Sequence, residues 1–217
     1  YPEKDVEINY EPVNILYEDV FLIVAFKPPF LLVHDDGNSQ DTLQARVNGY
    51  LLLNGNKYPA QAIHRIDYET SGLVLFCKHP FFQAYCDKNM EEHHIKKDYI
   101  ALVQGHTNYK NKKIVSNIAR DRHNAKKMII HPNGKESISI FNTLKNYKDC
   151  SLIQVTILTG RKHQIRVQCA SLNHPILNDS LYGGKRIDNT GLLLQSHHIQ
   201  FNDIDITCPQ EKRFIRK

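Results

Sequence analysis

The sequence has no apolar run that approaches the roughly 18 residues of a membrane-spanning helix, and its first residues do not form a signal peptide. We therefore predict no membrane partner. Its five cysteines include no Cys-x-x-Cys pair, and their odd number argues against a complete set of disulfides. Free thiols are typical of a reducing compartment, so we expect a cytoplasmic protein.

Metal-binding and nucleotide-binding patterns are missing as well. The twelve histidines and the cysteines do not have the spacing of zinc fingers, of H-E-x-x-H metalloproteases or of zinc-dependent base deaminases. The glycine-rich loop that binds phosphates and the dinucleotide fingerprint do not occur either. We predict no metal site.

The sequence does have the composition of an ordinary globular protein, with 41% hydrophobic and 24% charged residues in 217. This length allows one large domain or two small ones. No internal repeat or low-complexity linker divides the chain. Its start at Tyr1 rather than at a methionine suggests processing or trimming, with short flanking segments missing.

Charge is distributed unevenly along the chain. Residues 1–60 carry 4 Lys and Arg against 9 Asp and Glu, a net of −5, whereas residues 61–217 carry 24 against 14, a net of +10. Between Lys110 and Lys135 there are eight basic residues and one acidic residue. A solvated face can have this composition, but so dense a segment favours a polyanionic partner. We predict that this segment binds nucleic acid.

Apolar periodicity predicts more strands than helices. The basic segment shows little periodicity, so we expect a loop or short strands there, with a hairpin turn at Asn133-Gly134. Ser39 or Asp41 is placed to cap the first helix. Runs of strands with few helices between them indicate an α+β domain on a mixed, mainly antiparallel sheet with flanking helices. The expected elements are a hairpin over 13–26, strands over 73–76, 97–103, 138–144, 152–158 and 192–201, and helices after residue 41, after residue 79 and over 164–172.

The loop before the strand at 73–76 concentrates reactive groups. His64, Arg65 and Asp67 place an imidazole, a guanidinium and a carboxylate within four residues. Loops held by a rigid element are where reactive groups tend to lie, although a surface turn with solvated charges would have the same residues. This loop is our candidate for a site of chemistry.

Three motifs together resemble the signature of the RluA-type pseudouridine synthase family. Any one of them can arise by chance, but all three in this order are very specific. The resemblance extends from about residue 13 to about residue 205. It implies one α+β catalytic domain over residues 1–217 with a cleft across its middle, and no separate amino-terminal RNA-binding module. The motifs are His64-Arg65-Ile66-Asp67-x-x-Thr70-Ser71-Gly72-Leu73-x-Leu75, Lys97-Asp98-Tyr99, and Thr159-Gly160-Arg161-x-His163-Gln164-Ile165-Arg166-Val167 with His174-Pro175-Ile176-x-x-Asp179-x-x-Tyr182-Gly183 behind it.

This resemblance implies an RNA partner, ribosomal or transfer RNA, in which a specific uridine becomes pseudouridine. The bond from the ribose anomeric carbon to the base nitrogen breaks, the base turns, and it rejoins through a ring carbon. No redox change or outside group is needed, so no cofactor is expected. Whether the catalytic carboxylate adds covalently or removes a sugar proton stays open. We expect a monomer.

The resemblance also assigns roles to residues. Asp67 matches the catalytic carboxylate, Arg166 the cation that keeps it ionised and oriented, and Tyr99 the aromatic that packs on the target base. Arg65 matches the arginine inserted where the target nucleotide leaves its stack. The other residues predicted to bind the base or the RNA are His64, Arg161, His163, Gln164, Ile165, Lys112, Lys113, Lys126 and Lys127. For His64, Arg161, His163 and Gln164 the alternatives are a phosphate contact or a hydrogen bond that supports the contact residues, and His64 also fits a structural histidine.

Two other functions fit parts of the pattern. A non-catalytic RNA-binding protein or RNA chaperone would need the basic and aromatic residues but not Asp67. A hydrolase acting on a glycosidic bond would need a second carboxylate, for which Glu69 is the near candidate. Some residues depart from the family's usual pattern, among them Lys162 in place of Thr and Gln168 in place of His, which puts local contacts and substrate choice in doubt.

Overall fold

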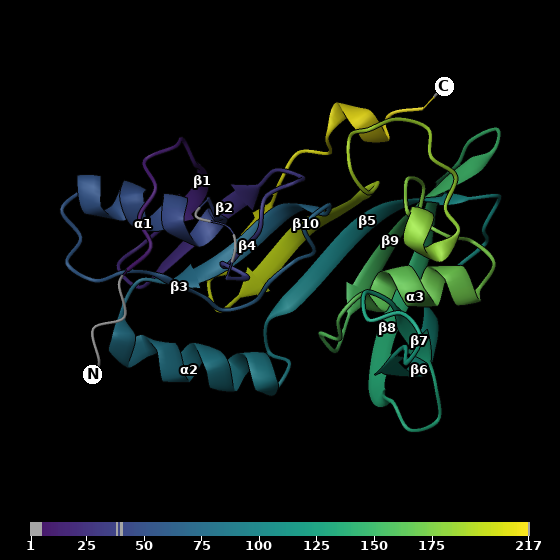
Figure 1. The fold of residues 1–217 in the computed structure, drawn as a ribbon, viewed down its shortest axis with the longest axis horizontal. Coiled ribbons are helices and arrows are strands. Elements are labelled where there is room, and N and C mark those ends of the chain that lie inside the picture. The colour runs from purple at the N-terminus through teal and green to yellow at the C-terminus, as the bar shows by residue number, and fades with distance from the viewer. Residues whose placement is uncertain (1–5, 38, 40, 217) are drawn as a thin grey trace.

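The protein is built on one large sheet, as seen in a computed structural model that describes residues 6–37, 39 and 41–216. The strands are β1 (Asn14–Glu18), β2 (Leu22–Lys27), β3 (Gln61–Ala62), β4 (Ser71–Cys77), β5 (Lys96–Gln104), β6 (Lys112–Arg120), β7 (Met128–Ile130), β8 (Lys135–Asn146), β9 (Cys150–Ile157), β10 (Leu194–Phe201) and β11 (Ile204–Thr207). Their order is β1-β2-β4-β10-β5-β9-β8-β6-β7, with β3 added to β4 and β11 added to β10 (Figure 1).

In the part of the chain that the structure describes, three α-helices flank this sheet: α1 (Leu43–Leu53), α2 (Pro80–Glu91) and α3 (Gln164–Ser171). Short 3-10 helices lie at Ser180–Tyr182 and Lys212–Phe214. In Figure 1, α1 and α2 accompany the half that contains β1, β2 and β4, and α3 accompanies the half that contains β6 to β9.

Both faces of β4 are buried because α1 and α2 cover opposite sides of it. Val74 and Phe76 belong to the same hydrophobic cluster as the apolar face of α1, and Leu73 and Leu75 belong to the cluster of Cys86 on α2. Alternate residues of a strand point to opposite faces, which explains this division. The cluster of α1 continues to β5 and β9, so one core supports both halves of the sheet.

The two halves meet where β4 runs beside β10. This is the one parallel pairing among the described strands, with Gln195 opposite Ser71 and Ser196 opposite Gly72. Gly72 has φ of 116°, and a Cβ there would lie 2.1 Å from the backbone oxygen of Ser196. A glycine is therefore required where the reactive loop enters β4.

The structure confirms the predicted α+β fold with a mixed, mainly antiparallel sheet, but two local predictions are wrong. Thr42 caps α1, since its Oγ1 accepts from the N–H of Ala45 at 3.0 Å, whereas Asp41 forms an ion pair with Arg46. The side chain of Ser39 donates to the backbone oxygen of Asp41.

The second wrong prediction concerns the basic segment, where Asn133-Gly134 turns the chain but closes no hairpin, because β7 and β8 lie on opposite sides of β6 and both pair with it. Much of it is the nine-residue strand β6, which pairs over seven residues with β8. Its four apolar residues come in two adjacent pairs and do not alternate with polar ones, and the pairing with a strand farther along the chain supplies the order that local periodicity does not indicate.

Candidate active site

A buried lysine holds the loop that carries Asp67. Lys27, the last residue of β2, is fully buried, and its ammonium donates to the backbone oxygens of Pro28 at 2.9 Å, Leu31 at 2.7 Å and Tyr68 at 3.1 Å. Burial lowers the pKa of Lys27 to about 7, and the charge of nearby Asp67 opposes this effect. The bond to Tyr68 fixes the backbone immediately after Asp67.

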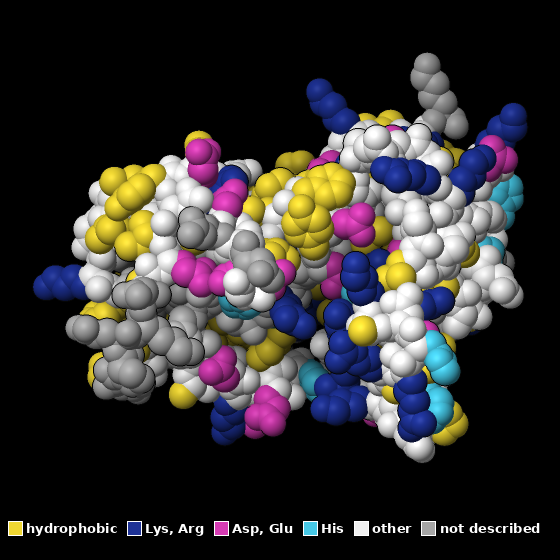
Figure 2. Space-filling model, viewed as in Figure 1, with side chains coloured by type: hydrophobic (Ala, Val, Ile, Leu, Met, Phe, Trp, Pro, Cys, Tyr) yellow, Lys and Arg dark blue, Asp and Glu magenta, His cyan; other side chains and the backbone are white. Residues whose placement is uncertain are grey.

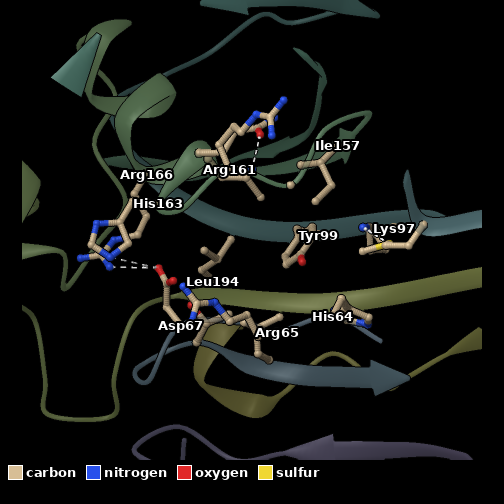
Figure 3. Close-up of a pocket in the computed structure, with 16 residues that line it drawn as sticks. His64, Arg65, Asp67, Lys97, Tyr99, Ile157, Arg161, His163, Arg166 and Leu194 are labelled. Carbon is tan, nitrogen blue, oxygen red and sulfur yellow. Dashed lines mark hydrogen bonds and ion pairs between the residues drawn. The ribbon is translucent and has the colours of Figure 1, made fainter. Parts of the chain in front are cut away.

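Asp67 and Asp179 share one guanidinium. Arg166 on α3 donates from Nη1 to Oδ2 of Asp67 at 3.0 Å, as drawn in Figure 3. It also donates from Nε and Nη2 to the two carboxylate oxygens of Asp179, at 2.8 Å and 2.9 Å. The side chain of Asp67 is 27% exposed, against 6% for Arg166 and 1% for Asp179. Asp179 therefore fixes the cation, and the cation orients a carboxylate that is still accessible.

This arrangement keeps Arg166 charged. Burial alone would lower the pKa of its guanidinium, but the hydrogen bonds and the negative charges of Asp179 and Asp67 outweigh burial and raise that pKa. A permanently charged arginine is thus held against the carboxylate of Asp67.

A histidine also faces Asp67. Nε2 of His163 lies 3.8 Å from Oδ2 of Asp67, and its Nδ1 lies 2.8 Å from the hydroxyl of Tyr182. That hydroxyl also accepts from the N–H of Met128 at 2.8 Å, and its own proton is available for Nδ1. Since Nε2 faces a carboxylate, which only accepts, Nδ1 is the nitrogen that accepts from the hydroxyl. The proton of neutral His163 then sits on Nε2, toward Asp67. Burial lowers the pKa of His163 to about 4, despite the opposing charge of Asp67.

Asp67 opens onto a cavity of about 260 Å³. This volume is close to the lower end, about 300 Å³, of typical small-ligand pockets. Apolar side chains and the ring of Tyr99 form much of its wall, and burial raises the pKa of that tyrosine, which therefore stays neutral. Figure 3 shows Asp67, His163 and Arg166 on one side, Tyr99 in the middle, and Lys97 and His64 on the far side. The apolar wall residues are Ile66, Ile157, Ile165 and Leu194.

A wider cavity of about 720 Å³ borders the same carboxylate. Arg65, Asp67 and Arg166 line both cavities, and Lys126 and Lys162 line the wider one. In Figure 2, Lys and Arg side chains gather beside a central hollow on the α3 half, whereas Asp and Glu side chains are more frequent on the other half. Cationic side chains therefore flank the approach to Asp67.

The predicted basic residues do not form one continuous strip. Lys112 and Lys113 begin β6, whereas Lys126 and Lys127 precede β7, which pairs with the other end of β6 near Arg120. Eight steps of about 3.3 Å separate the two ends of β6 by roughly 26 Å. Of these four lysines, Lys126 alone lines either of the two cavities, the wider one; Nζ of Lys127 lies 5.6 Å from the centre of the Tyr182 ring.

Gln164 lines the smaller cavity, and its hydrogen bonds fit the supporting role that was the alternative to a phosphate contact. Its Oε1 accepts from Thr159 and from the N–H of Arg161, and its Nε2 donates to the backbone oxygen of Ile138 and to Ser139. The amide is buried and its groups are engaged within the protein. Gln164 braces the turn before α3 rather than facing the cleft with a free polar group.

The remaining predicted residues lie around the smaller cavity. Arg161 is exposed and donates from Nε to the backbone oxygen of Glu136, while Arg65 is exposed beside Asp67. His64 is buried, and its Nε2 accepts from the N–H of Leu75 at 3.2 Å.

The sequence assigned no role to several residues that prove important here. Asp179 and Tyr182 belong to the third motif, and their spacing from Arg166 was the available signal. Lys27 and Lys97 are buried cations, and nothing in their local sequence indicates burial.

Among the described residues, no group of histidine, cysteine, aspartate and glutamate side chains has a metal-binding arrangement. None of the described helices is long and apolar enough to cross a membrane.

Comparison with known proteins gives a consistent result. Residues 21–171 match the family model of RNA pseudouridylate synthases. The chain is 37% identical over 217 residues to the ribosomal large subunit pseudouridine synthase C of Buchnera aphidicola, with 92% of this chain and 68% of that protein covered. It is 35% identical over 179 residues to an uncharacterized RNA pseudouridine synthase of Bacillus subtilis, with 81% and 59% covered.

The fold has a solved counterpart. The structure of human RNA pseudouridylate synthase domain containing 1 superposes with a TM-score of 0.77 at 23% identity, covering 93% of this chain and 85% of that one. The chain spans 59% of the length of the Bacillus subtilis relative, so the expectation of no amino-terminal module stays a prediction.

Proposed function

This chain belongs to the RNA pseudouridylate synthase family, in its RluA-type branch, and on that premise we propose that it isomerises a specific uridine of ribosomal or transfer RNA to pseudouridine. Asp67 is the catalytic carboxylate in this proposal. The observation that carries it is the pairing of an accessible Asp67 with Arg166 at the mouth of a small, largely apolar cavity.

The two cavities suit two parts of the substrate. The smaller one, walled by Tyr99 and aliphatic side chains, suits a single extruded base. The wider one is lined by acidic residues, Asp35, Asp36 and Glu69, as well as by basic ones. Its cations Arg65, Lys126 and Lys162 suit the phosphates of the strand from which the base leaves. Asp67 lies between them, where the sugar of the extruded nucleotide would be.

A carboxylate at that point can act on the sugar or on the base. As a nucleophile, Asp67 would form a bond to carbon while the bond to the leaving nitrogen breaks; as a base, it would take a proton from the sugar. Both routes need a carboxylate that is held in position, and the hydrogen bond from Arg166 orients it. Tyr99 would pack on the base and hold it while it turns.

The hydrolase alternative lacks its second group. Among the described residues that line the smaller cavity, Asp67 is the one carboxylate, because Glu69 lines only the wider cavity. Asp179 lies close, but both of its oxygens accept from Arg166. A glycosidase would need a free general acid on the far side of the scissile bond.

The test is pseudouridine mapping of total RNA from cells with and without the gene, complemented by wild type, Asp67→Asn or Asp203→Asn. Asp203 is an exposed aspartate between β10 and β11 and is the matched control. A site that disappears with the gene should return with wild type and Asp203→Asn but not with Asp67→Asn. Restoration by Asp67→Asn would contradict the catalytic role, and free uracil in place of pseudouridine would indicate a hydrolase.

A further inference from the structure

The far side of the smaller cavity carries two buried hydrogen-bond donors, Lys97 and His64, that the proposed chemistry at Asp67 does not use. Lys97 and Tyr99 are two residues apart on β5, so they share one face of the strand and both line this cavity. Asp98 between them points to the other face, where His198 lies 2.8 Å away. His64, from the loop before β4, lies beside Lys97 (Figure 3).

Lys97 is a buried cation without a carboxylate. Lys97 is 6% exposed, and its ammonium lies 3.2 Å from Sδ of Met90. A thioether is a weak acceptor. Among the described residues no carboxylate oxygen lies within 4.0 Å of this ammonium. The neighbouring Lys96, by contrast, forms an ion pair with Asp98. Burying a charge in this way is costly unless an acceptor arrives.

His64 presents a second donor in the same place. Its Nε2 accepts from the N–H of Leu75, so neutral His64 carries its proton on Nδ1. That nitrogen is buried and has no hydrogen-bond partner among the described residues. Burial, followed by the charge of Lys97, lowers the pKa of His64 to about 3, so it stays neutral and its Nδ1–H remains a donor.

We propose that Lys97 and His64 form a subsite for a carbonyl oxygen of the target uracil, on the edge of the base that lies away from Asp67. The inference rests on the proposed function and names the group that recognises the base. With the sugar at Asp67, the edge nearest Lys97 carries O4. Cytosine has an amino group in place of O4, and this donor would face two further donors; the subsite therefore selects uracil.

The same subsite serves the reaction. When the bond from the anomeric carbon to N1 breaks, both of its electrons leave with the base, and the negative charge spreads to O2 and O4. An ammonium and an N–H that bind one of these oxygens would stabilise that charge without any proton transfer. Turning the ring about the line through N3 and C6 exchanges N1 with C5 and O4 with O2. One subsite therefore holds O4 before the turn and O2 after it, while C5 comes to the sugar.

The experiment compares single-turnover pseudouridine formation by Lys97→Met, Lys97→Arg, His64→Gln and Lys96→Met, with RNA from cells that lack the gene as substrate. Met keeps the length of the side chain and its packing on Met90, and Gln retains an acceptor for the N–H of Leu75 without the Nδ1 donor. Lys96→Met is the same substitution one residue away, on an exposed side chain outside the cavity.

We expect Lys97→Met to slow the saturated rate by about 10²-fold, the usual effect of removing one such donor. RNA affinity should stay within about two-fold, and Lys97→Arg should recover much of the rate. His64→Gln should slow the saturated rate less than Lys97→Met does, and Lys96→Met should react at the wild-type rate. Thermal unfolding of each variant separates loss of the subsite from loss of the fold.

The pH profile supplies a readout that a structural role would not move. Burial lowers the pKa of Lys97 to about 8, so the wild-type rate should fall as pH rises past that value, and in Lys97→Arg this fall should move to higher pH. The other titratable groups on the cavity are His64, Asp67, Tyr99, His163 and the arginines Arg65, Arg161 and Arg166; Lys27, behind the loop, is the same in both proteins.

The outcomes are distinguishable. If wild type forms no pseudouridine, the proposed function fails. If wild type is active and Lys97→Met retains its saturated rate within about three-fold, or loses only RNA affinity, the subsite is overturned while the proposed function stands.

Discussion

The hydroxyl of Tyr182 donates to Nδ1 of His163 over 2.8 Å, and this bond determines which nitrogen of the imidazole faces Asp67. The Tyr182 ring also lies 5.1 Å from the guanidinium carbon of Arg166 and 5.6 Å from the ammonium of Lys127. One side chain therefore contacts both partners of Asp67 and a basic residue of the turn before β7. Tyr182 links this basic turn to the carboxylate.

We predict that Tyr182→Phe slows pseudouridine formation by roughly 3- to 10-fold, because His163 loses the donor that keeps its proton on Nε2. The N–H of Met128 also loses its acceptor, at a cost of about 1 kcal/mol in the free energy of unfolding. Single-turnover rates and denaturant unfolding measure the two effects. Tyr147→Phe is the control, since Tyr147 lies outside both cavities; equal rates for both variants would contradict the link.

Asp179→Asn should lower the free energy of unfolding substantially. Arg166 then loses one of its two carboxylates and is buried with a weaker partner, a change that typically costs about 3–5 kcal/mol. The rate should fall with it, because Arg166 is no longer fixed opposite Asp67. Urea unfolding and rate measurement on the folded fraction check this, and an Asp179→Asn protein with wild-type stability would contradict it.

Lys27 predicts a particular dependence of stability on pH. Its pKa is about 7 in the folded protein, against an ordinary lysine value of 10.5 in the unfolded chain, so between these values the unfolded state binds more protons. Its contribution to the free energy of unfolding is full above pH 10.5 and is lost as pH falls to 7, at up to about 1.4 kcal/mol per pH unit.

Lys27→Met removes this contribution. The stability of the variant relative to wild type should therefore be highest near pH 7 and fall as pH rises toward 10. Urea unfolding at pH 7, 8 and 9 is sufficient to measure it. A pH-independent difference would mean that the ammonium is not held in the buried position.

The basic residues give a prediction about salt. Replacing Lys126 and Lys162 with alanine should weaken RNA binding and reduce the slope of log affinity against log salt by about 0.7 for each phosphate that is no longer neutralised. The double substitution of Lys112 and Lys113 is matched in charge and lies away from both cavities. Equal reductions for the two pairs would instead support one RNA path along the whole of β6.

The sequence was sufficient for the features that local pattern encodes. The strand after Gly72, the helix that begins at Gln164 and the α+β class follow from apolar periodicity and turn residues, which belong to short segments. The pairing of Asp67 with Arg166 across 99 positions was expected only from the resemblance to the family.

What the sequence did not indicate depends on contacts between distant segments. Lys27 becomes buried only because carbonyls of Leu31 and of Tyr68, 41 positions away, surround its ammonium. The strand at Lys112–Arg120 has weak periodicity and is ordered by its pairing with β8. Such environments are properties of the assembled sheet, and composition or spacing cannot express them.

The most direct test of the catalytic role of Asp67 is a single-turnover assay of purified wild type and Asp67→Asn on RNA from cells that lack the gene. We predict that wild type converts a defined uridine to pseudouridine without releasing uracil. Asp67→Asn should bind the same RNA within a few-fold of wild type and form no product. Appreciable pseudouridine formation by Asp67→Asn would contradict the central claim that this carboxylate carries the chemistry.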